Sequence, residues 1–308
     1  MPVVAATTGS RTTTSSARAR GRNNVPTRLL VFGMAHADGT VEAGELFPVA
    51  EACGLSADQV RSCLRRMIGE GLFTQDGAGR AARYRPTEDG QRALTTFHER
   101  TRLAYAQDLA GRGWDRHWHL VAFGIPESRR GARDALRDRL VGLGGAAVHN
   151  GLYVSPHQWE DDVAATVAEL GVAGSVTVAS TDELSIGGEG DPRVLAARLW
   201  PLDDLAARYQ RFIDAHEYVP GYLEGLRARR EHMADEVFVS GALQVTVEFQ
   251  AVFNDDPLLP PELLPRPWPG RAARELLLRS RRLALQLRTT GARPALFRTY
   301  DEAIESLR

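Results

Sequence analysis

Lysine is missing from this sequence: all 38 basic residues are arginines, a bias that genomic base composition is enough to explain. Cysteine is nearly missing too, and Cys53 and Cys63 are predicted to pack as small reduced side chains rather than as a redox pair. No apolar run approaches the roughly 20 residues that a membrane-spanning helix needs, and the N-terminus lacks the apolar core of a secretory signal. We therefore expect a cytoplasmic protein with no membrane partner.

The motifs of common enzymes are absent as well. The sequence has no G-x-S-x-G elbow, no phosphate-cradling glycine loop and no dinucleotide fingerprint. His117 and His119 alternate along a predicted strand and share one face, but no cysteine or acid cluster accompanies them, so at most weak metal binding would result. Adjacent acids, as at 161–162 and 203–204, point in different directions on a helix. These absences predict no catalytic residues, no metal site and no cofactor.

Charge is distributed unevenly along the chain. Its 308 residues, 43% of them apolar, are enough for the cores of two or three domains. The net charge is −1, yet residues 1–108 hold 14 arginines and 11 acids, whereas the remainder holds 24 arginines and 28 acids. A mildly basic front on an acidic body is typical of a protein that presents one end to DNA.

The stretch 56–85 combines a capped helix with a basic hairpin. Ser56 and Gln59 form the S-x-x-Q pattern of a capping box, and apolar residues recur behind them at every third or fourth position. A glycine ends the helix, and two short strands at 72–75 and 83–85 flank a turn. A polar, arginine-bearing helix followed by such a hairpin predicts a winged helix-turn-helix that binds DNA.

The DNA-contacting side chains follow from this arrangement. Arginine and glutamine offer two hydrogen bonds each to guanine and adenine edges, respectively, and arginines on a wing suit phosphates or the minor groove. The alternative is a solvated basic face on a packing module. The predicted contacts are Gln59, Arg61, Ser62, Arg65 and Arg66 on the helix and Arg80, Arg83 and Arg85 on the hairpin.

The coarse pattern predicts an α+β multidomain protein. Residues 1–25, rich in Thr, Ser, Ala and Arg, are predicted to be a disordered tail. Residues 26–92 are assigned to the winged helix, with further helices at 26–36 and 41–53. A helix at 93–113 is predicted to link this domain to the rest of the chain.

The middle region, 114–184, alternates strands and helices in the order β-α-β-β-α-β, which is typical of a ferredoxin-like domain. An Asn-Gly pair at 150–151 predicts the hairpin between its second and third strands. This fold hosts enzymes and ligand-binding modules alike, so it does not settle function. The predicted elements are strands at 118–123, 146–148, 152–154 and 175–179 and helices at 129–143 and 159–170.

The last region, 191–300, is predicted to be all α. Its one ambiguous segment is 237–247, where β-branched residues favour a strand by propensity. Apolar residues recur on one face at every third or fourth position through this segment, so we predict a helix. The expected helices are at 203–218, 222–233, 235–254 and 271–288.

Several motifs resemble those of the PaaX-like family of transcriptional repressors of phenylacetic acid catabolism. They are GLSADQVRSCLRRMIGEGLF and GRAARYRPTEDG at the front, WHLVAFGIPESRRGARDALRDRLVGLGGAAVHNGLYVSP in the middle and DPLLPPELLPRPWPG near the end. The resemblance implies a winged helix, a ferredoxin-like middle and a helical C-terminal domain. It also implies a homodimeric repressor that binds double-stranded operator DNA and releases it on binding an acyl-coenzyme A effector, typically phenylacetyl-CoA.

The middle domain of this family is similar to the CRISPR-adaptation nucleases. Those nucleases carry an aspartate just after the first strand, whereas residues 124–127 here are Gly-Ile-Pro-Glu, which argues against nuclease activity. A metal-dependent nuclease, or another enzyme based on the middle domain, is nevertheless the alternative hypothesis. A scaffold whose helical part binds another protein is a third.

A CoA thioester requires cations for its phosphates and an apolar slot for its acyl group. Arginines at the start of the first middle-domain helix would lie near free N–H groups, which favour an anion. The alternative for the aromatic candidates is ordinary core packing, and for the arginines it is a solvated helix face. The candidate effector-binding residues are Arg129, Arg130, Arg133, Trp118, Tyr153, Trp159 and Trp200.

Overall fold

The computed structural model describes residues 27–288, 296–299 and 301. It combines helices with two antiparallel sheets, which confirms the mixed α+β class predicted from the sequence. The predicted disordered tail at 1–25 lies outside the described residues. Within the part of the chain that is described, no helix is both long and apolar enough to span a membrane.

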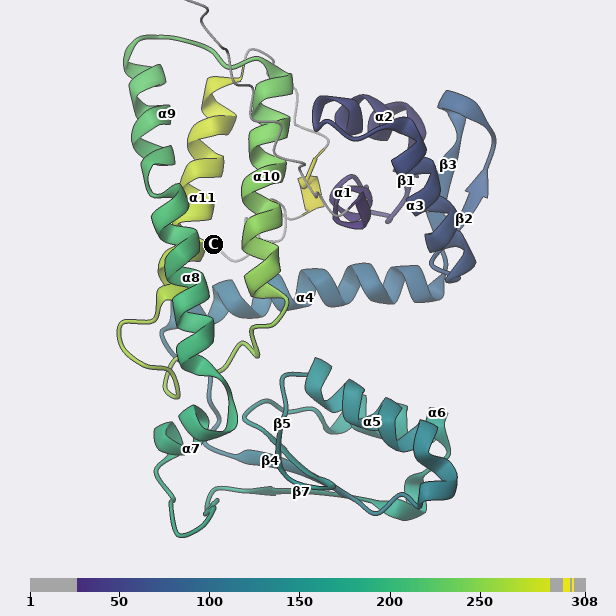
Figure 1. Ribbon diagram of the computed structural model, residues 1–308, viewed down its shortest axis with the longest axis vertical. Coiled ribbons are helices and arrows are strands. Elements are labelled where there is room, and N and C mark those ends of the chain that lie inside the picture. The colour runs from purple at the N-terminus through teal and green to yellow at the C-terminus, as the bar shows by residue number, and fades with distance from the viewer. Residues whose placement is uncertain (1–26, 289–295, 300, 302–308) are drawn as a thin grey trace, which may run out of the picture.

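The N-terminal region packs three helices against a three-stranded sheet of order β1-β3-β2 (Figure 1). The continuous helix predicted at 41–53 is wrong at its start, because Val41 and Glu42 pair with Tyr84 and Arg83 of the hairpin. Hydrogen bonds to a distant strand decide the conformation of these two residues, and the local apolar pattern gives no sign of them. The elements are α1 (Thr27–Gly33), β1 (Val41–Glu42), α2 (Ala43–Ala52), α3 (Ala57–Gly69), β2 (Phe73–Asp76) and β3 (Arg83–Pro86).

Both cysteines lie buried and free in this region, as the sequence predicts. Burial raises the pKa of the Cys53 thiol to about 11, and burial also raises the pKa of the Cys63 thiol. Thiols with raised pKa values stay protonated at neutral pH and are poor nucleophiles. Cys53 and Cys63 therefore act as small apolar core residues.

A 23-residue helix, α4 (Glu88–Ala110), runs from the hairpin across the molecule (Figure 1). Thr87 caps it by accepting a hydrogen bond from the Gly90 N–H at 3.1 Å. Gly111 ends it with a φ of 65°, a conformation that favours glycine. The helix thus starts before the linker predicted at 93–113, and the domain boundaries drawn from the sequence remain predictions.

The middle region forms a four-stranded antiparallel sheet of order β5-β6-β4-β7. Helices α5 and α6 cover one face of this sheet (Figure 1), where Val121, Leu136 and Val163 pack together. The other face, with Trp118 and Val154, packs against residues of the helical region. The elements follow the predicted β-α-β-β-α-β order: β4 (Trp118–Phe123), α5 (Arg130–Gly142), β5 (Ala146–His149), β6 (Leu152–Ser155), α6 (Glu160–Leu170) and β7 (Val176–Thr181).

Helices make up the regular structure of the described residues beyond β7. The ambiguous segment 237–247 lies within a helix, as predicted. The helix predicted at 222–233 is misplaced: α8 stops at His216 and the next helix begins at Tyr218. Pro220 explains the break, because it has no N–H to donate to the His216 carbonyl. The helices are α7 (Pro192–Leu199), α8 (Leu202–His216), α9 (Tyr218–Ala228), α10 (Asp235–Phe253) and α11 (Pro269–Leu287).

The N-terminal region and the C-terminal helices share one hydrophobic core. The cluster that holds Val31 of α1 and Leu46 of α2 also contains Phe238 and Phe249 of α10. Figure 1 shows α10 beside α1 and α2, with α4 running beneath them. Because packed interiors transmit displacement, a shift of α10 is felt by α1 and α2.

The loop between α10 and α11 joins distant parts of the chain through Asp256. Its carboxylate accepts a hydrogen bond from the Tyr209 hydroxyl at 2.6 Å and lies 3.9 Å from the Arg274 guanidinium. Arg100 of α4 donates to the Asp256 carbonyl at 2.7 Å. Arg274 in turn forms a two-armed pair with Asp108, at 2.6 and 2.8 Å. This buried charged junction (Arg100, Asp108, Tyr209, Asp256 and Arg274) ties α4 to α8 and α11.

Candidate nucleic-acid interface

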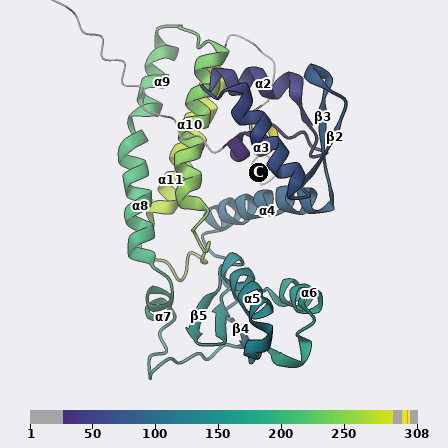
Figure 2. The ribbon, with the colours of Figure 1, turned by 45° about the vertical axis from the view of Figure 1, so that its right-hand side comes forward.

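Helix α3 is anchored at its start and polar along its outer side. The predicted capping box is present: Ser56 Oγ accepts from the Gln59 N–H at 3.2 Å, and the Ser56 N–H donates to Gln59 Oε1 at 2.8 Å. The Gln59 side chain is exposed but is engaged in this cap. Figure 2 shows α3 on the outer side of the molecule, next to the β2–β3 hairpin. The other predicted contacts on α3 are also exposed: Arg61, Ser62, Arg65 and Arg66.

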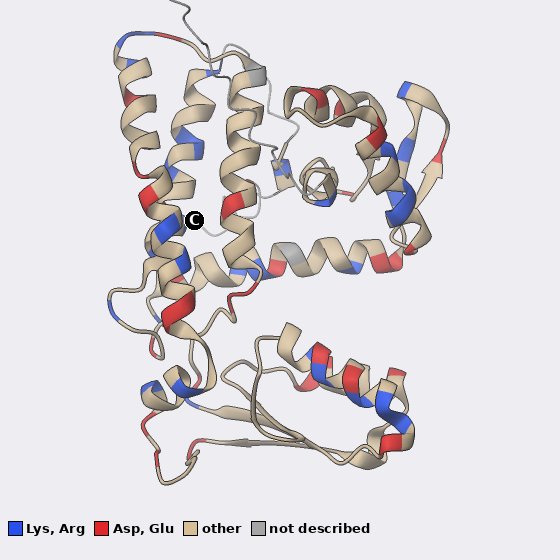
Figure 3. Cartoon of the chain, viewed as in Figure 1, with Lys and Arg blue, Asp and Glu red and all other residues tan. Residues whose placement is uncertain are grey.

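Three of the predicted arginines meet at one groove between α3 and the hairpin. Arg61 and Arg65 extend from the helix, Arg80 from the hairpin tip, and all three line a hollow of about 480 Å³. Phe47 and Tyr84 are also among its lining residues. Figure 3 shows basic residues on α3 and on the hairpin at this end of the molecule. We call Arg61, Arg65 and Arg80 the groove arginines.

The remaining predicted arginines lie elsewhere. Arg83 and Arg85 alternate with the buried Tyr84 along β3, so they face the opposite side of the small sheet and line a separate hollow with His36. Arg66 lies on the flank of α3 that faces the start of α1, beside Cys63. The structure therefore sorts the predicted arginines of this end into three locations rather than one continuous surface.

Acidic neighbours distinguish these arginines further. Arg61 pairs with Asp58 at 2.8 Å, Arg83 with Glu42 at 3.3 Å, and Arg85 with Asp76 at 3.7 Å. Within the described residues, Arg65, Arg66 and Arg80 have no ion-pair partner, and of these three Arg65 and Arg80 line the groove. Sequence reasoning missed Asp58, although its position three residues before Arg61 on one helix face is a recognisable signal.

The four candidate effector aromatics do not form a slot. Trp118 and Trp200 stack in the core on one face of the middle sheet, with ring centroids 6.4 Å apart. Tyr153 and Trp159 lie in the core on the helix-covered face. A four-stranded sheet separates the two pairs, because neighbouring residues of β6 point to opposite faces. Core packing, the alternative interpretation, accounts for all four.

The three candidate effector arginines sit on the surface near the start of α5. Arg129 donates to the carbonyls of Gly171 and Leu170, both at 2.7 Å, and so caps the end of α6. Arg130 and Arg133 both lie within ion-pair distance of Glu127 and Asp134. Among the residues that the structure describes, the hydrogen bonds and ion pairs of these arginines go to the end of α6, Glu127 and Asp134, and none goes to an aromatic candidate.

Metal-ligating residues gather at one place within the described residues, at His36, Glu42 and Glu45. Arginines already compensate both carboxylates, Arg83 at Glu42 and Arg298 at Glu45. The predicted strand histidines differ from each other: His117 is exposed, whereas His119 is buried between Asp115 (3.2 Å) and Glu160 (2.5 Å). Each of these groups is held by ordinary ion pairs and hydrogen bonds.

Comparison with known proteins places these regions in one family. Family models match residues 27–90 (PaaX-like protein), 111–195 (PaaX protein central Cas2-like domain) and 200–293 (PaaX-like protein C-terminal domain). The transcriptional repressor PaaX of Escherichia coli (strain K12) is 27% identical over 250 residues, which cover 80% of this chain and 74% of that protein.

A solved structure has a similar fold. It is the uncharacterized protein Rv0674 from Mycobacterium tuberculosis, 20% identical, with a TM-score of 0.50 and coverage of 92% of this chain and 98% of that one. The sequence relative is a transcriptional regulator rather than an enzyme. Three models of one family follow one another along nearly the whole described chain, and the protein belongs to the PaaX-like family.

Proposed function

We propose that this protein is a DNA-binding transcriptional repressor whose α3 and β2–β3 hairpin form a winged helix-turn-helix. The single observation that carries the proposal is the groove where Arg61, Arg65 and Arg80 converge. A helix capped at its N-terminus, exposed on one face and flanked by a basic hairpin has the shape and charge that the major groove accepts.

The groove arginines would contact different parts of the DNA. Arg61 and Arg65 project from the helix, where a guanidinium can donate two hydrogen bonds to the O6 and N7 of guanine. Arg80 lies at the hairpin tip and meets the phosphate backbone, which supplies affinity without sequence information. Asp58 holds Arg61 in the absence of DNA at 2.8 Å, so binding exchanges one charged partner for another. Arg83 and Arg85 would reach only a flanking phosphate.

A homodimer would place two α3 helices on a two-fold operator, with half-sites about 34 Å apart. Strand β7 supports association through the middle region, because it lies at an edge of its sheet. Its central residues are exposed, including Val178. An exposed strand edge offers unpaired backbone groups to a second strand.

The ligand we propose for this repressor is an aryl- or acyl-CoA thioester, and phenylacetyl-CoA is the first candidate. The operon we propose that it controls is one for the catabolism of an aromatic acid such as phenylacetate. Release requires only that the ligand bind better to a geometry that misplaces the α3 helices. A hundredfold loss of operator affinity corresponds to about 2.7 kcal/mol of differential binding, which one ligand can supply. The core shared by α10 with α1 and α2 supports such coupling.

The test is operator retardation by the Arg61→Ala/Arg65→Ala variant on upstream DNA of its own operon. We expect about a hundredfold loss of affinity, because two base-contacting guanidinium groups are removed. The matched control is Arg137→Ala/Arg211→Ala, which removes two exposed arginines from α5 and α8. Equal affinity in the two double variants, with both folded, would show that α3 does not read the operator.

A further inference from the structure

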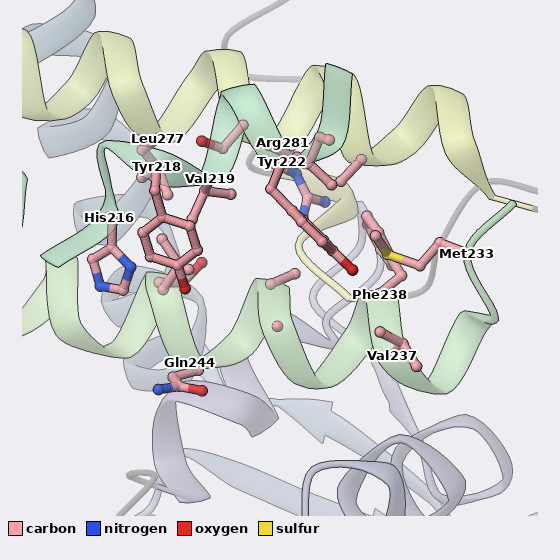
Figure 4. Close-up of a pocket in the computed structure, with 17 residues that line it drawn as sticks. His216, Tyr218, Val219, Tyr222, Met233, Val237, Phe238, Gln244, Leu277 and Arg281 are labelled. Atoms are coloured by element: carbon pink, nitrogen blue, oxygen red, sulfur yellow. The ribbon is translucent and has the colours of Figure 1, made fainter. Parts of the chain in front are cut away.

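The C-terminal helices form a cavity that the local sequence patterns did not predict. It has a volume of about 350 Å³ and lies between α9, α10 and α11, closed at one end by the last residue of α8 (Figure 4). Its lining is mainly apolar, with Leu277 on α11 and Val245 on α10. Tyr218 and Tyr222 border it while remaining 66% and 57% exposed, so the cavity is open to solvent on the α9 side. This size falls at the lower end of small-molecule sites, which span roughly 300–1,000 Å³.

Two polar atoms of lining residues are buried and have no hydrogen-bond partner within the described residues, although the Arg281 guanidinium also lies over the Phe238 and Phe297 rings. They are Nη1 of Arg281 and Nδ1 of His216, whose side chains are only 6% and 8% exposed. The rest of each side chain is satisfied: His216 Nε2 lies 2.7 Å from Glu248, and Arg281 pairs with Asp301 at 2.5 and 2.7 Å. A buried polar atom without a hydrogen-bond partner is costly and uncommon in folded proteins, so these two atoms are candidates for contact with a ligand.

We propose that this cavity binds the apolar acyl group of a small ligand, with a carbonyl or carboxylate oxygen accepting a hydrogen bond from Arg281 Nη1. The apolar walls, with Phe238 and the two tyrosines, fit an aromatic ring. His216 Nδ1 offers a second polar contact along the cavity, beside Tyr218 in Figure 4. The inference rests on the proposed response to an acyl ligand and names its site.

Arg281 also connects this cavity to the DNA-reading end. Its Nη2 donates to the Leu296 carbonyl at 3.0 Å, and the adjacent Phe297 N–H donates to the Gly33 carbonyl of α1 at 2.5 Å. Arg298 donates to Glu45 of α2. The guanidinium that would hold the ligand therefore also holds a segment packed against α1 and α2. A ligand that redirects Arg281 changes the support of the winged helix.

A thioester and a free acid share this acyl chemistry, and the surroundings of the cavity can distinguish them. The last turn of α9 and the loop after it carry the exposed Arg227, Arg229 and Arg230 shortly before Met233, which lines the cavity. Such a cluster suits the phosphates of coenzyme A. Arg229 is paired with Glu231 at 2.7 Å, whereas Arg227 and Arg230 have no ion pair within the described residues.

Gly241 provides a way to fill the cavity without disturbing its walls. It lines the cavity on α10, and a Cβ placed there meets no heavy atom within 4 Å. Gly241→Phe would put a ring into the space proposed for the ligand. Gly221→Phe is the matched control: it is also a helical glycine with nothing within 4 Å of its Cβ, but it does not line the cavity. A second variant, His216→Phe, keeps the ring packed on Phe212 (centroids 4.8 Å apart) and removes only the polar atoms.

The experiment measures binding of phenylacetyl-CoA, phenylacetate and free coenzyme A to the full chain by calorimetry, and release of operator DNA by phenylacetyl-CoA. We expect Gly241→Phe to weaken acyl-ligand binding by at least about a hundredfold and His216→Phe by about tenfold, with Gly221→Phe unchanged. Phenylacetate binding that Gly241→Phe abolishes would identify the free acid as sufficient. Binding of phenylacetyl-CoA alone, weakened by Arg227→Gln/Arg230→Gln, would identify the thioester.

Two results would overturn this site. If the wild-type chain binds phenylacetyl-CoA and releases DNA, and both Gly241→Phe and His216→Phe do the same, the ligand proposal stands but the cavity is not its site. If Gly241→Phe reduces the oligomeric mass and leaves ligand affinity unchanged, the cavity is a contact between subunits. A wild-type chain that binds neither acyl ligand refutes both the ligand and the site, while operator retardation by the α3 variants still decides DNA binding.

Discussion

Arginines at the two ends of this chain occupy opposite environments. On α3 and the hairpin they are exposed and weakly paired, and Arg65 and Arg80 have no ion-pair partner among the described residues. In the buried charged junction, Arg274 is 6% exposed and holds Asp108 with two hydrogen bonds. Burial alone would lower the pKa of Arg274, but the hydrogen bond and charge of Asp108 outweigh it and raise that pKa. The exposed arginines are accessible to a binding partner, whereas Arg274 holds α4 and α11 together.

The largest effect is expected where the junction loses a charge. Arg274→Ala should destabilise the fold by about 3–5 kcal/mol, because the partly buried Asp108 loses its two-armed partner and the buried Asp256 keeps only Arg100 as a nearby cation. Denaturant unfolding of the whole chain measures this change. The control is Arg271→Ala, one turn away on α11, where an exposed pair with Glu275 (3.0 Å) contributes at most about 1 kcal/mol. Similar losses of unfolding free energy in the two variants would mean that the junction contributes no more to stability than an exposed ion pair.

An intermediate effect should separate the two sides of the hairpin. Arg80→Ala is expected to weaken operator binding several-fold. It should also make the slope of the logarithm of the association constant against the logarithm of salt concentration shallower by about 0.9, the value for one phosphate contact. Arg83→Ala should change both quantities less, because Arg83 faces the other hollow and is paired with Glu42. The measurement is retardation or anisotropy over a series of salt concentrations. The reverse ranking would show that the His36 side of the sheet faces DNA.

Local patterns predicted helix α3 well. The Ser56–Gln59 capping box requires only residues three apart, and spacing alone placed it correctly. The same holds for α10, where a repeat of apolar residues at every third or fourth position outweighed β propensity. In both cases the forces that decide the structure act within one helix, so the sequence displays them directly.

Features built from distant residues were not predictable in this way. Val41 and Glu42 are a strand only because β3 returns beside them. The split between the groove arginines and Arg83 depends on which face of β3 the buried Tyr84 occupies. The cavity draws on residues of four helices that are far apart in the sequence, with His216 on α8 and Arg281 on α11 among them. Tertiary packing, not propensity, brings these groups together.

The smallest effect concerns Asp115 and Glu160, two partly exposed carboxylates hydrogen-bonded to the buried His119. Burial would raise the pKa of Asp115, but hydrogen bonds from the His117 N–H, Gln158 and His119 outweigh it and lower that pKa. The pKa of Glu160 is lowered in the same way: burial would raise it, but the hydrogen bond with His119 outweighs the effect of burial. Because both folded-state pKa values are depressed, their stabilisation is present above the unfolded values of 3.8 and 4.5 and is lost as pH falls through the folded ones.

Asp115→Asn should therefore be less stable than wild type at neutral pH, by no more than about 1 kcal/mol for such a partly exposed pair. The gap should begin to close near pH 3.8, where the unfolded carboxylate starts to bind protons, and should vanish once the pH has fallen through the lowered pKa of the folded Asp115. Thermal unfolding of both proteins across this range measures it, with Asp161→Asn, an exposed acid of α6, as the control. If the stability difference between Asp115→Asn and wild type persists at low pH, Asp115 stabilises the fold through packing rather than through its charge.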